Sequence, residues 1–205
     1  LSESSDQQKM RSIVLRAQCS SCLIWLYAIL DPRECVYDTY TPIFRSILDD
    51  AKQLVGHKPL SAHKKSPVLS TDLGIVQPLW LTATKSRDVK TRLEAIGLLR
   101  KSGRDAPFEG RVLALVARRA AELEAPPLSS TVDRKGSLSD LIPEYRRIVD
   151  CGPDTEQHDP ADGSGIVAFF KRCVNVKDLM TGESIDEHKK DAHWKTWKEK
   201  IKCES

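Results

Sequence analysis

Residues 77–102 read QPLWLTATKSRDVKTRLEAIGLLRKS, and this stretch indicates how the chain folds. It runs from an apolar patch around Trp80, through a turn, into a basic amphipathic segment. The spacing of its apolar residues predicts a helix over 86–101, with Asp88 in the first turn, as the helix dipole prefers, and Gly103 as the C-terminal stop. The buried stripe of this helix is expected to consist of Val89, Leu93, Ile96 and Leu99.

The segments that precede this stretch also carry helical patterns. Residues 8–30 form one predicted helix, whose second half is apolar nearly all round and is therefore expected to be deeply buried. The sequence DPRE at 31–34 resembles a capping box and predicts a second helix up to Val55, which Pro42 should kink or restart at Thr41. The side chains expected in the core are Ile13, Ala17, Leu23, Leu26 and Leu30 in the first helix, and Tyr37, Tyr40, Phe44, Ile47, Leu48, Ala51, Leu54 and Val55 in the second.

Two further helices are expected beside the opening stretch. A short apolar helix is predicted over 74–84, with Pro78 inside its first turns, and a longer helix is predicted over 107–124, which the sequence APP ends. The longer helix is expected to bury Phe108, Val112, Leu115, Val116 and Leu123.

The composition changes after this helical part. Residues 126–143 are rich in Ser, Pro and Gly and predict a linker. Residues 144–151 and 165–174 are rich in β-branched and aromatic residues and predict an antiparallel hairpin with a long polar loop. The tail, 183–203, is expected to form a last helix with Ile185, Trp194, Trp197 and Ile201 on one side. The sequence therefore predicts a mainly α protein of packed helical hairpins with a small C-terminal β-hairpin, divided into 1–125, 126–143 and 144–205.

The bulk composition is that of an ordinary soluble globular protein. The chain has 205 residues, 40% hydrophobic and 30% charged, with a formal net charge of +3. This charge is too small to indicate nucleic-acid binding by the whole chain. The longest apolar run, 22–30, is shorter than the roughly 20 residues that a membrane span needs, and no signal-peptide pattern is visible. Because the chain begins with Leu1 rather than Met, we expect a preceding segment.

Six cysteines are spread from Cys19 to Cys203, and their spacing argues against a metal site. Cys19 and Cys22 form a C-x-x-C pair inside a helical pattern, but no second close pair completes a four-ligand zinc site. We therefore expect free, buried thiols in a reducing compartment, with no metal and no cofactor in this chain.

Four blocks of sequence, in a fixed order, carry a resemblance to a known family. They are LIWLYAILDPRECVYDTYTPIFRSILDDAKQL (23–54), LGIVQPLWLTATKSRDVKTRLEAIGLLRKS (73–102), FEGRVLALVARRAAELE (108–124) and IPEYRRI (142–148). Together they resemble the C-terminal regulatory region of fungal zinc-binuclear-cluster transcription factors. The most specific run spans 78–88, where the family-motif residues are Pro78, Trp80, Lys85, Arg87 and Asp88.

The resemblance implies a non-catalytic regulatory or effector domain, with 1–125 as its helical regulatory core, in a nuclear protein. Its partners would be proteins of the transcription machinery or a second copy of itself, with a small-molecule effector as a further candidate. Zinc would belong to an upstream DNA-binding segment, because the compact cysteine cluster of the family is absent here. The alternative is a stand-alone small-molecule-binding protein, or an enzyme, that reuses the same helical fold.

The candidate site residues have both structural and functional interpretations. Trp80 is expected to be a core anchor, although it could line a ligand pocket with other aromatic residues. The pair Arg87 and Asp88 is expected to form a helix start with ion pairs. Residues 85–119 hold ten Lys and Arg against four Asp and Glu, a local net charge of +6, which we expect to be solvated helix faces without specific DNA binding. The candidate pocket or core-anchor residues are Trp25, Tyr27, Trp80 and Phe108.

Overall fold

The computed structural model describes residues 2–56, 74–105, 108–125, 142–154, 165–173 and 194–202. Within these residues the chain is mainly helical with a small antiparallel sheet at its C-terminal end, which confirms the predicted fold class. The helices are α1 (Ser2–Ala28), α2 (Thr41–Gly56), α3 (Val76–Lys85), α4 (Val89–Lys101) and α5 (Gly110–Glu124), with 3-10 helices η1 (Glu34–Tyr40) and η2 (Glu144–Arg146). The strands are β1 (Arg104–Asp105), β2 (Phe108–Glu109), β3 (Ile148–Pro153), β4 (Ile166–Cys173) and β5 (Trp194–Ile201).

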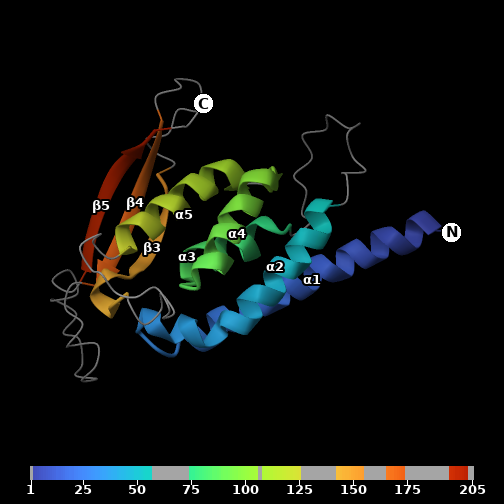
Figure 1. Ribbon diagram of the computed structural model, residues 1–205, viewed down its shortest axis with the longest axis horizontal. Coiled ribbons are helices and arrows are strands. Elements are labelled where there is room, and N and C mark those ends of the chain that lie inside the picture. Colours follow the sequence, from blue (N-terminus) through green and yellow to red (C-terminus); the bar gives the residue numbers. More distant parts are fainter. Residues whose placement is uncertain are drawn as a thin grey trace.

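The helices form antiparallel hairpins, and the sheet stands at one end of them (Figure 1). The α1 and α2 helices lie side by side along the lower edge of the view, and the N-terminal end of α1 extends beyond the other described elements. Above them, α3, α4 and α5 pack against one another, and α5 also packs on the sheet. The C-terminal end of α1 and strand β3, which are far apart in the sequence, lie on the same side of the fold.

Three apolar clusters hold these layers together, and Trp80 contacts two of them. The largest joins α2, α3, α4 and α5, mostly through leucines and alanines. A second lies between α5 and the sheet, and a third lies between α1, α2 and α3. Trp80 packs against the first and the second cluster and is half-buried. Their best-buried members are Leu48, Ala51, Leu79, Ala83, Ala95 and Leu99 in the first, Val116, Ala120, Ile148, Ala168 and Phe170 in the second, and Ile24, Phe44 and Ile47 in the third.

The sequence correctly predicted helices that correspond to α1, α2, α3, α4 and α5, but it misplaced some of their buried faces. In α1 the body covers only one face, which holds Ile13, Ala17, Ile24 and Ala28, so the predicted deep burial of its second half is wrong. Leu23, Leu26 and Leu30 are instead exposed. In α2 the predicted stripe is confirmed at Phe44, Ile47, Leu48 and Ala51.

In α4 and α5 small or charged side chains replace several of the predicted apolar ones. The prediction that Val89 and Leu93 are buried is wrong, because α4 turns Thr91, Arg92 and Ala95 inward. In α5 three alanines (Ala114, Ala117 and Ala120) permit close helix contacts, and Val112 and Leu115 remain only half-buried. The predicted burial of Leu99 and Val116 is confirmed, whereas the side chain of Phe108 and that of Val55 lie outside the described residues.

Local chemistry explains where the helices begin. The predicted restart at Thr41 is confirmed, since α2 begins there with Pro42 in its first turn, where no N–H is needed. The segment before it forms η1 rather than an α-helix, and Asp31 pairs with Arg33 at 2.6 Å instead of capping it. Asp88 caps α4 by accepting a hydrogen bond from the Thr91 N–H at 3.1 Å. The predicted stop at Gly103 is confirmed by its φ of 75°.

The sheet has the order β3-β4-β5, with both pairs antiparallel, so the predicted hairpin is confirmed as β3 and β4. The predicted tail helix is wrong over 194–201, because this segment is β5 and pairs with the whole of β4. Trp197 stands opposite Phe170, and their ring centroids are 5.8 Å apart. This contact favours a strand, in which alternate residues face the core. Ile185, Cys203 and most of the predicted linker lie outside the described residues, and the division into three regions stays a prediction.

Candidate functional site

Charged side chains meet inside the fold between η1, the α3–α4 turn, the end of α5 and the start of β3. We call this cluster the ion network. The side chains of Arg87 and Glu124 are completely buried, and those of Glu34 and Arg92 are 6% exposed. Because burial of an unpaired charge costs several kcal/mol, each member needs a partner. The ion network consists of Glu34, Asp38, Lys85, Arg87, Arg92, Glu124, Glu144 and Arg147.

Arg87 occupies the centre of the ion network. Its Nη2 donates to Glu124 Oε1 at 2.7 Å and to Glu34 Oε2 at 3.1 Å, and its Nη1 donates to the Lys85 carbonyl at 2.7 Å. Burial alone would lower the pKa of Arg87, but the carboxylates of Glu124 and Glu34 raise it above its ordinary value. The guanidinium therefore stays charged and joins η1 to the end of α5.

Glu124, the last residue of α5, binds two arginines and one backbone amide. Its Oε1 accepts from Arg87 and from the Ile148 N–H at 2.6 Å, and its Oε2 lies 2.7 Å from Arg92 Nη2. Burial would raise the pKa of this carboxyl, but Arg87, Arg92 and the Ile148 N–H lower it to about 2. The carboxylate therefore fixes the first residue of β3 against the helices.

Lys85 ends α3 and closes one side of the ion network. Its Nζ lies 2.8 Å from Glu34 Oε1 and donates to the Val149 carbonyl at 2.6 Å. The same ammonium lies 4.9 Å from the centroid of the Tyr37 ring, within cation–π range. Lys85 thus links α3, η1 and β3.

Glu144 completes the network from the η2 side by capping η1. Its carboxylate accepts from the Glu34 N–H and, at 2.9 Å, from the Cys35 N–H, which are two free donors at the start of η1. Arg147 Nη2 lies 2.8 Å from Asp38 Oδ2 on η1. The segment that precedes β3 is thereby bound to a helix more than a hundred residues earlier in the chain.

A cavity of about 310 Å³ lies next to the ion network. It is bordered by the end of α1, η1, α3 and β3, and Lys85 and Glu34 are shared by the cavity and the network. The structure brings together two of the predicted pocket residues here, Trp25 at 52% exposure and the half-buried Trp80. Tyr27 is 59% exposed and is not among the lining residues. The other aromatic residue of the wall is Tyr37, which sequence analysis assigned only to the core.

Burial affects the protonation of two groups in the cavity wall, a thiol and a phenol. Burial raises the pKa of the Cys151 thiol to about 12, and burial followed by the Glu34 charge raises the pKa of the Tyr37 hydroxyl to about 12. Both groups are neutral at pH 7, and Lys85 is held by Glu34. The wall therefore offers aromatic faces, hydrogen bonds and fixed charges, whereas the thiolate that a cysteine nucleophile requires is not formed.

The family-motif residues have distinct structural roles. Pro78 is buried in the first turn of α3, Lys85 and Arg87 belong to the ion network, and Asp88 caps α4 as the predicted helix start. The ion pairs of Arg87 are made with Glu34 and Glu124 rather than with its neighbour Asp88.

Sequence analysis missed Glu34, Arg92 and Glu124 as members of a site. A signal was present for two of them, because each lies in phase with a buried stripe. Glu124 stands four residues after Ala120 on α5, and Arg92 stands three residues before Ala95 on α4. A charged residue on the buried face of a helix indicates an internal partner, but the sequence does not identify that partner.

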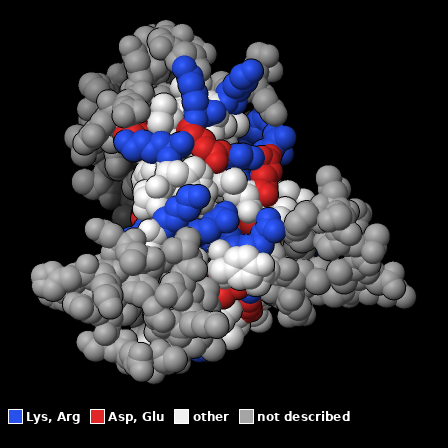
Figure 2. Space-filling model, turned by 90° about the vertical axis from the view of Figure 1, so that its left-hand side faces the viewer, with Lys and Arg blue, Asp and Glu red and all other residues white. Residues whose placement is uncertain are grey.

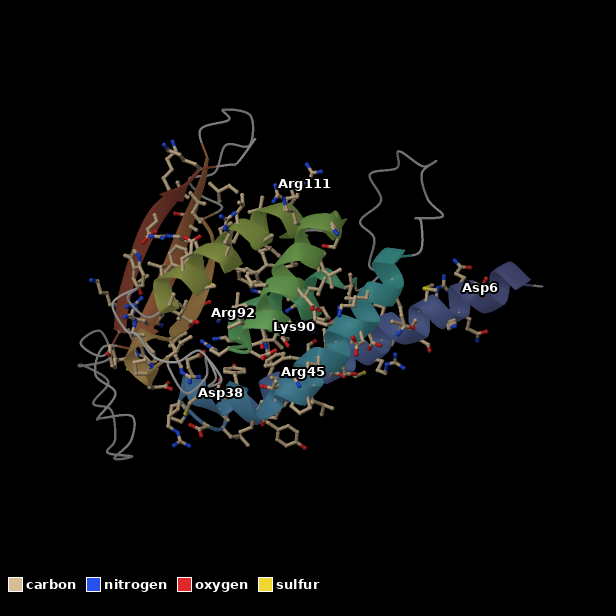
Figure 3. All side chains as sticks on the ribbon, in the orientation of Figure 1. Asp6, Asp38, Arg45, Lys90, Arg92 and Arg111 are labelled. Atoms are coloured by element: carbon tan, nitrogen blue, oxygen red, sulfur yellow. The ribbon has the colours of Figure 1, made fainter. Side chains whose placement is uncertain are left out.

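The basic stretch 85–119 is only partly a set of solvated faces. Lys85, Arg87 and Arg92 are directed inward, so the prediction of solvated faces is wrong for these three. Arg111 is exposed and projects from the start of α5, whereas Arg92 lies inside the body (Figure 3). The local net charge counted from the sequence therefore overstates the charge at the surface.

Figure 2 shows the face of the molecule on the sheet side, where Lys and Arg side chains are interspersed with acidic ones. Lys198 pairs with Asp154 at 2.6 Å, and Arg119 pairs with Glu199 at 2.7 Å. Lys171 lies 5.0 Å from the Trp194 ring. Partners within the chain thus engage Lys171 and Lys198 of the sheet, and Glu199 of the sheet engages Arg119 of α5.

The described part of the chain contains no group of three or more His, Cys, Asp or Glu placed to hold a metal ion. Its five described cysteines are free thiols, but Cys19 and Cys22 are exposed, so their predicted burial is wrong. No helix among the described residues is long and apolar enough to cross a membrane. Comparison of the chain with protein-family models, curated proteins and solved structures found no match.

Proposed function

We propose that the chain is a non-catalytic regulatory domain of a fungal transcription factor. The observation that carries this proposal is the composition of the ion network. Each of the four sequence blocks that carry the family resemblance supplies at least one of its charged residues. The first block supplies Glu34 and Asp38, the second Lys85, Arg87 and Arg92, the third Glu124, and the fourth Glu144 and Arg147.

The network gives a physical reason for the four blocks to occur together in one chain. Loss of one partner from a buried ion pair typically costs about 3–5 kcal/mol, because the remaining charge stays buried without compensation. The residues of one block can therefore be exchanged only together with those of another. Because all four blocks meet at one buried centre, together they support a fold shared with the family better than any single block does.

In this proposal the chain acts through protein contacts or sensing in the nucleus, and a separate segment reads DNA and binds zinc. The central cations of the basic stretch 85–119 support this division, since Arg87 and Arg92 are buried and paired and cannot reach a phosphate backbone. Their role is to position the elements of the fold.

The test is the sequence that precedes Leu1 in the same transcript. The proposal expects a cluster of six cysteines with close C-x-x-C pairs and basic flanks within the parent reading frame. A reading frame that starts near Leu1 and encodes no such cluster would reject this function and favour a stand-alone protein.

A second candidate function, the binding of a small-molecule effector, is favoured by the cavity beside the ion network. Its volume of about 310 Å³ lies at the lower end of the range of ligand pockets, and Trp25, Tyr37 and Trp80 line it. A ligand there would contact the side chain of Lys85 and thereby the ion network. Binding would thus perturb the contacts that Lys85 makes with Glu34 on η1 and with the Val149 carbonyl on β3.

A fragment screen by ligand-observed NMR tests this second candidate. Val149→Trp places a bulky side chain in the cavity wall, and Val167→Trp is a matched control on the neighbouring strand, since both valines are half-buried. Fragments that bind the wild type and Val167→Trp but not Val149→Trp would support binding in this cavity. Equal binding to all three proteins, or no binding at all, would contradict it.

A further inference from the structure

A groove of about 860 Å³ lies between α4 and α5, apart from the cavity beside the ion network. Its floor is apolar, with Leu93 and Ile96 from α4 and Val112 and Leu115 from α5. The apolar spacing of both helices predicted that these four side chains are buried, but Leu93 is 59% exposed and the other three are half-buried. The described residues thus leave an apolar strip uncovered between the two helices. We call this site the α4–α5 groove.

Cations surround this apolar floor and form a cationic rim, which consists of Arg100, Lys101, Arg111 and Arg118. Arg118 pairs with Glu122 at 3.4 Å. The other three form no ion pair with a described residue, and Arg111 projects outward from the start of α5 (Figure 3). Glu109 is the one acidic residue among the described residues that line the groove. The groove therefore has an excess of positive charge, which attracts a negatively charged partner.

Gly97 lies inside α4 and lines the α4–α5 groove. A glycine inside a helix makes the helix less stable than an alanine would. A Cβ at this position would meet no atom within 4 Å, so the described residues give no packing reason for a glycine here. The missing side chain instead deepens the groove and permits the backbone of a partner to approach α4 closely.

We propose that the α4–α5 groove binds an acidic amphipathic helix of a partner protein. The apolar stripe of that helix would lie on the groove floor, and its Asp or Glu side chains would face the cationic rim. Helix-in-groove contacts use apolar side chains at i, i+4 and i+7, which span about 10 Å along a helix. The groove is long enough, because Leu93 and Arg100 are seven residues apart on α4. This binding is independent of the proposed regulatory function, since it uses neither the ion network nor its cavity.

The chemistry of the α4–α5 groove favours this partner over a second copy or a nucleic acid. A second copy that docked through the same groove would bring its own cationic rim against the first, and like charges at an interface repel. A nucleic acid would place phosphates over the apolar floor, and the described lining residues include no aromatic ring on which a base can stack. An acidic amphipathic helix supplies both the apolar side chains and the negative charge that the groove requires.

Fluorescence anisotropy of a labelled peptide with the full chain tests the proposal. The probe has about 18 residues, enough for an isolated helix to form, with Leu at i, i+4 and i+7 on one face, Glu on both flanks of that face and Ala elsewhere. One control peptide has the same composition with the Leu residues spread around the helix, and the other has Lys in place of Glu. The chain should bind the probe at least about tenfold more tightly than either control. Equal binding of the three peptides, or no binding of the probe, would overturn the proposal.

Substitutions inside and outside the groove locate the binding. Gly97→Leu adds a side chain where a Cβ meets no described atom, so it should melt at no lower temperature than the wild type and yet weaken probe binding by about tenfold. Arg111→Glu reverses one charge of the rim and should weaken probe binding by about threefold or more. The matched control is Lys90→Glu, since Lys90 is exposed on α4 outside the groove, and it should bind the probe like the wild type.

Three results would contradict this site. The first is a Gly97→Leu protein that binds the probe as tightly as the wild type does, and the second is an equal effect of Arg111→Glu and Lys90→Glu. The third is displacement of the probe at physiological salt by an unlabelled oligonucleotide, which would assign the groove to a nucleic acid instead.

Discussion

Glu124→Gln perturbs the ion network at its centre while it preserves the size and shape of the side chain. The amide can still accept from the Ile148 N–H, which now donates to the carboxylate at 2.6 Å. It cannot neutralise Arg87 and Arg92, which would face each other in the buried site with Glu34 as the remaining carboxylate that contacts Arg87. We expect the free energy of unfolding to fall by about 3–5 kcal/mol, the usual cost of breaking a buried ion pair.

Urea unfolding followed by circular dichroism measures this change. A loss of that size is a large share of the about 5–15 kcal/mol that holds a domain together, so the midpoint should fall sharply at an unchanged slope. The matched control is Glu122→Gln on the same helix, where the carboxylate is 49% exposed and pairs with Arg118 and Arg119 at the surface. The control should change stability by less than about 1 kcal/mol. If Glu124→Gln were no more destabilising than Glu122→Gln, the ion network would not hold the fold together.

Three further predictions follow from the same contacts. The pKa of Glu124 is about 2 in the folded state and that of an unfolded Glu is about 4.3, so this carboxylate should contribute about 3 kcal/mol to the free energy of unfolding above pH 4.5. This contribution should be lost as the pH falls towards 2. Unfolding measured at a series of pH values should therefore show that Glu124→Gln loses less stability in acid than the wild type does. Trp80 is half-buried between two apolar clusters, so Trp80→Ala should lower the free energy of unfolding by about 2–3 kcal/mol and Trp80→Phe should lower it by about 1 kcal/mol. A Trp80→Ala protein that unfolds like the wild type in a thermal melt would contradict this packing role. Cys151, buried and with a pKa of about 12, should resist a thiol reagent until urea unfolds the chain, as mass spectrometry of the labelled protein can show; rapid labelling of the native protein would refute its burial.

The helices and the first two strands of the sheet could be predicted because their signals are local. Apolar spacing, the Pro42 restart and the Gly103 stop each act within a few residues. The structure confirms the restart, the stop and the helices that apolar spacing predicted, but it does not confirm all of their predicted buried faces. The last strand could not be predicted in this way. Trp194, Trp197 and Ile201 fit a helix face as well as they fit a strand, and the contact of Trp197 with Phe170 on β4 decides between the two.

The ion network could not be predicted because the sequence does not identify which charged residues pair, and some of them have a satisfactory local interpretation. Glu34 looks like part of a capping box, and Arg87 looks like one cation among many in a basic stretch. Their roles depend on Glu124 and Glu144, which lie 90 and 110 residues after Glu34 in the chain. The burial of the outer face of α1 was predicted wrongly because its apolar pattern indicates a covered face, whereas the described residues leave this face exposed.

Transcription from a reporter gene tests the central claim most directly. The chain is fused to the DNA-binding segment of an unrelated transcription factor and compared with that segment alone, at equal protein levels. The account predicts that the fused chain changes reporter transcription, that Glu122→Gln preserves the change, and that Glu124→Gln abolishes it, because the regulatory surfaces depend on the ion network. A wild-type fusion that leaves transcription at the level of the DNA-binding segment alone would contradict the proposal that this chain is a regulatory domain.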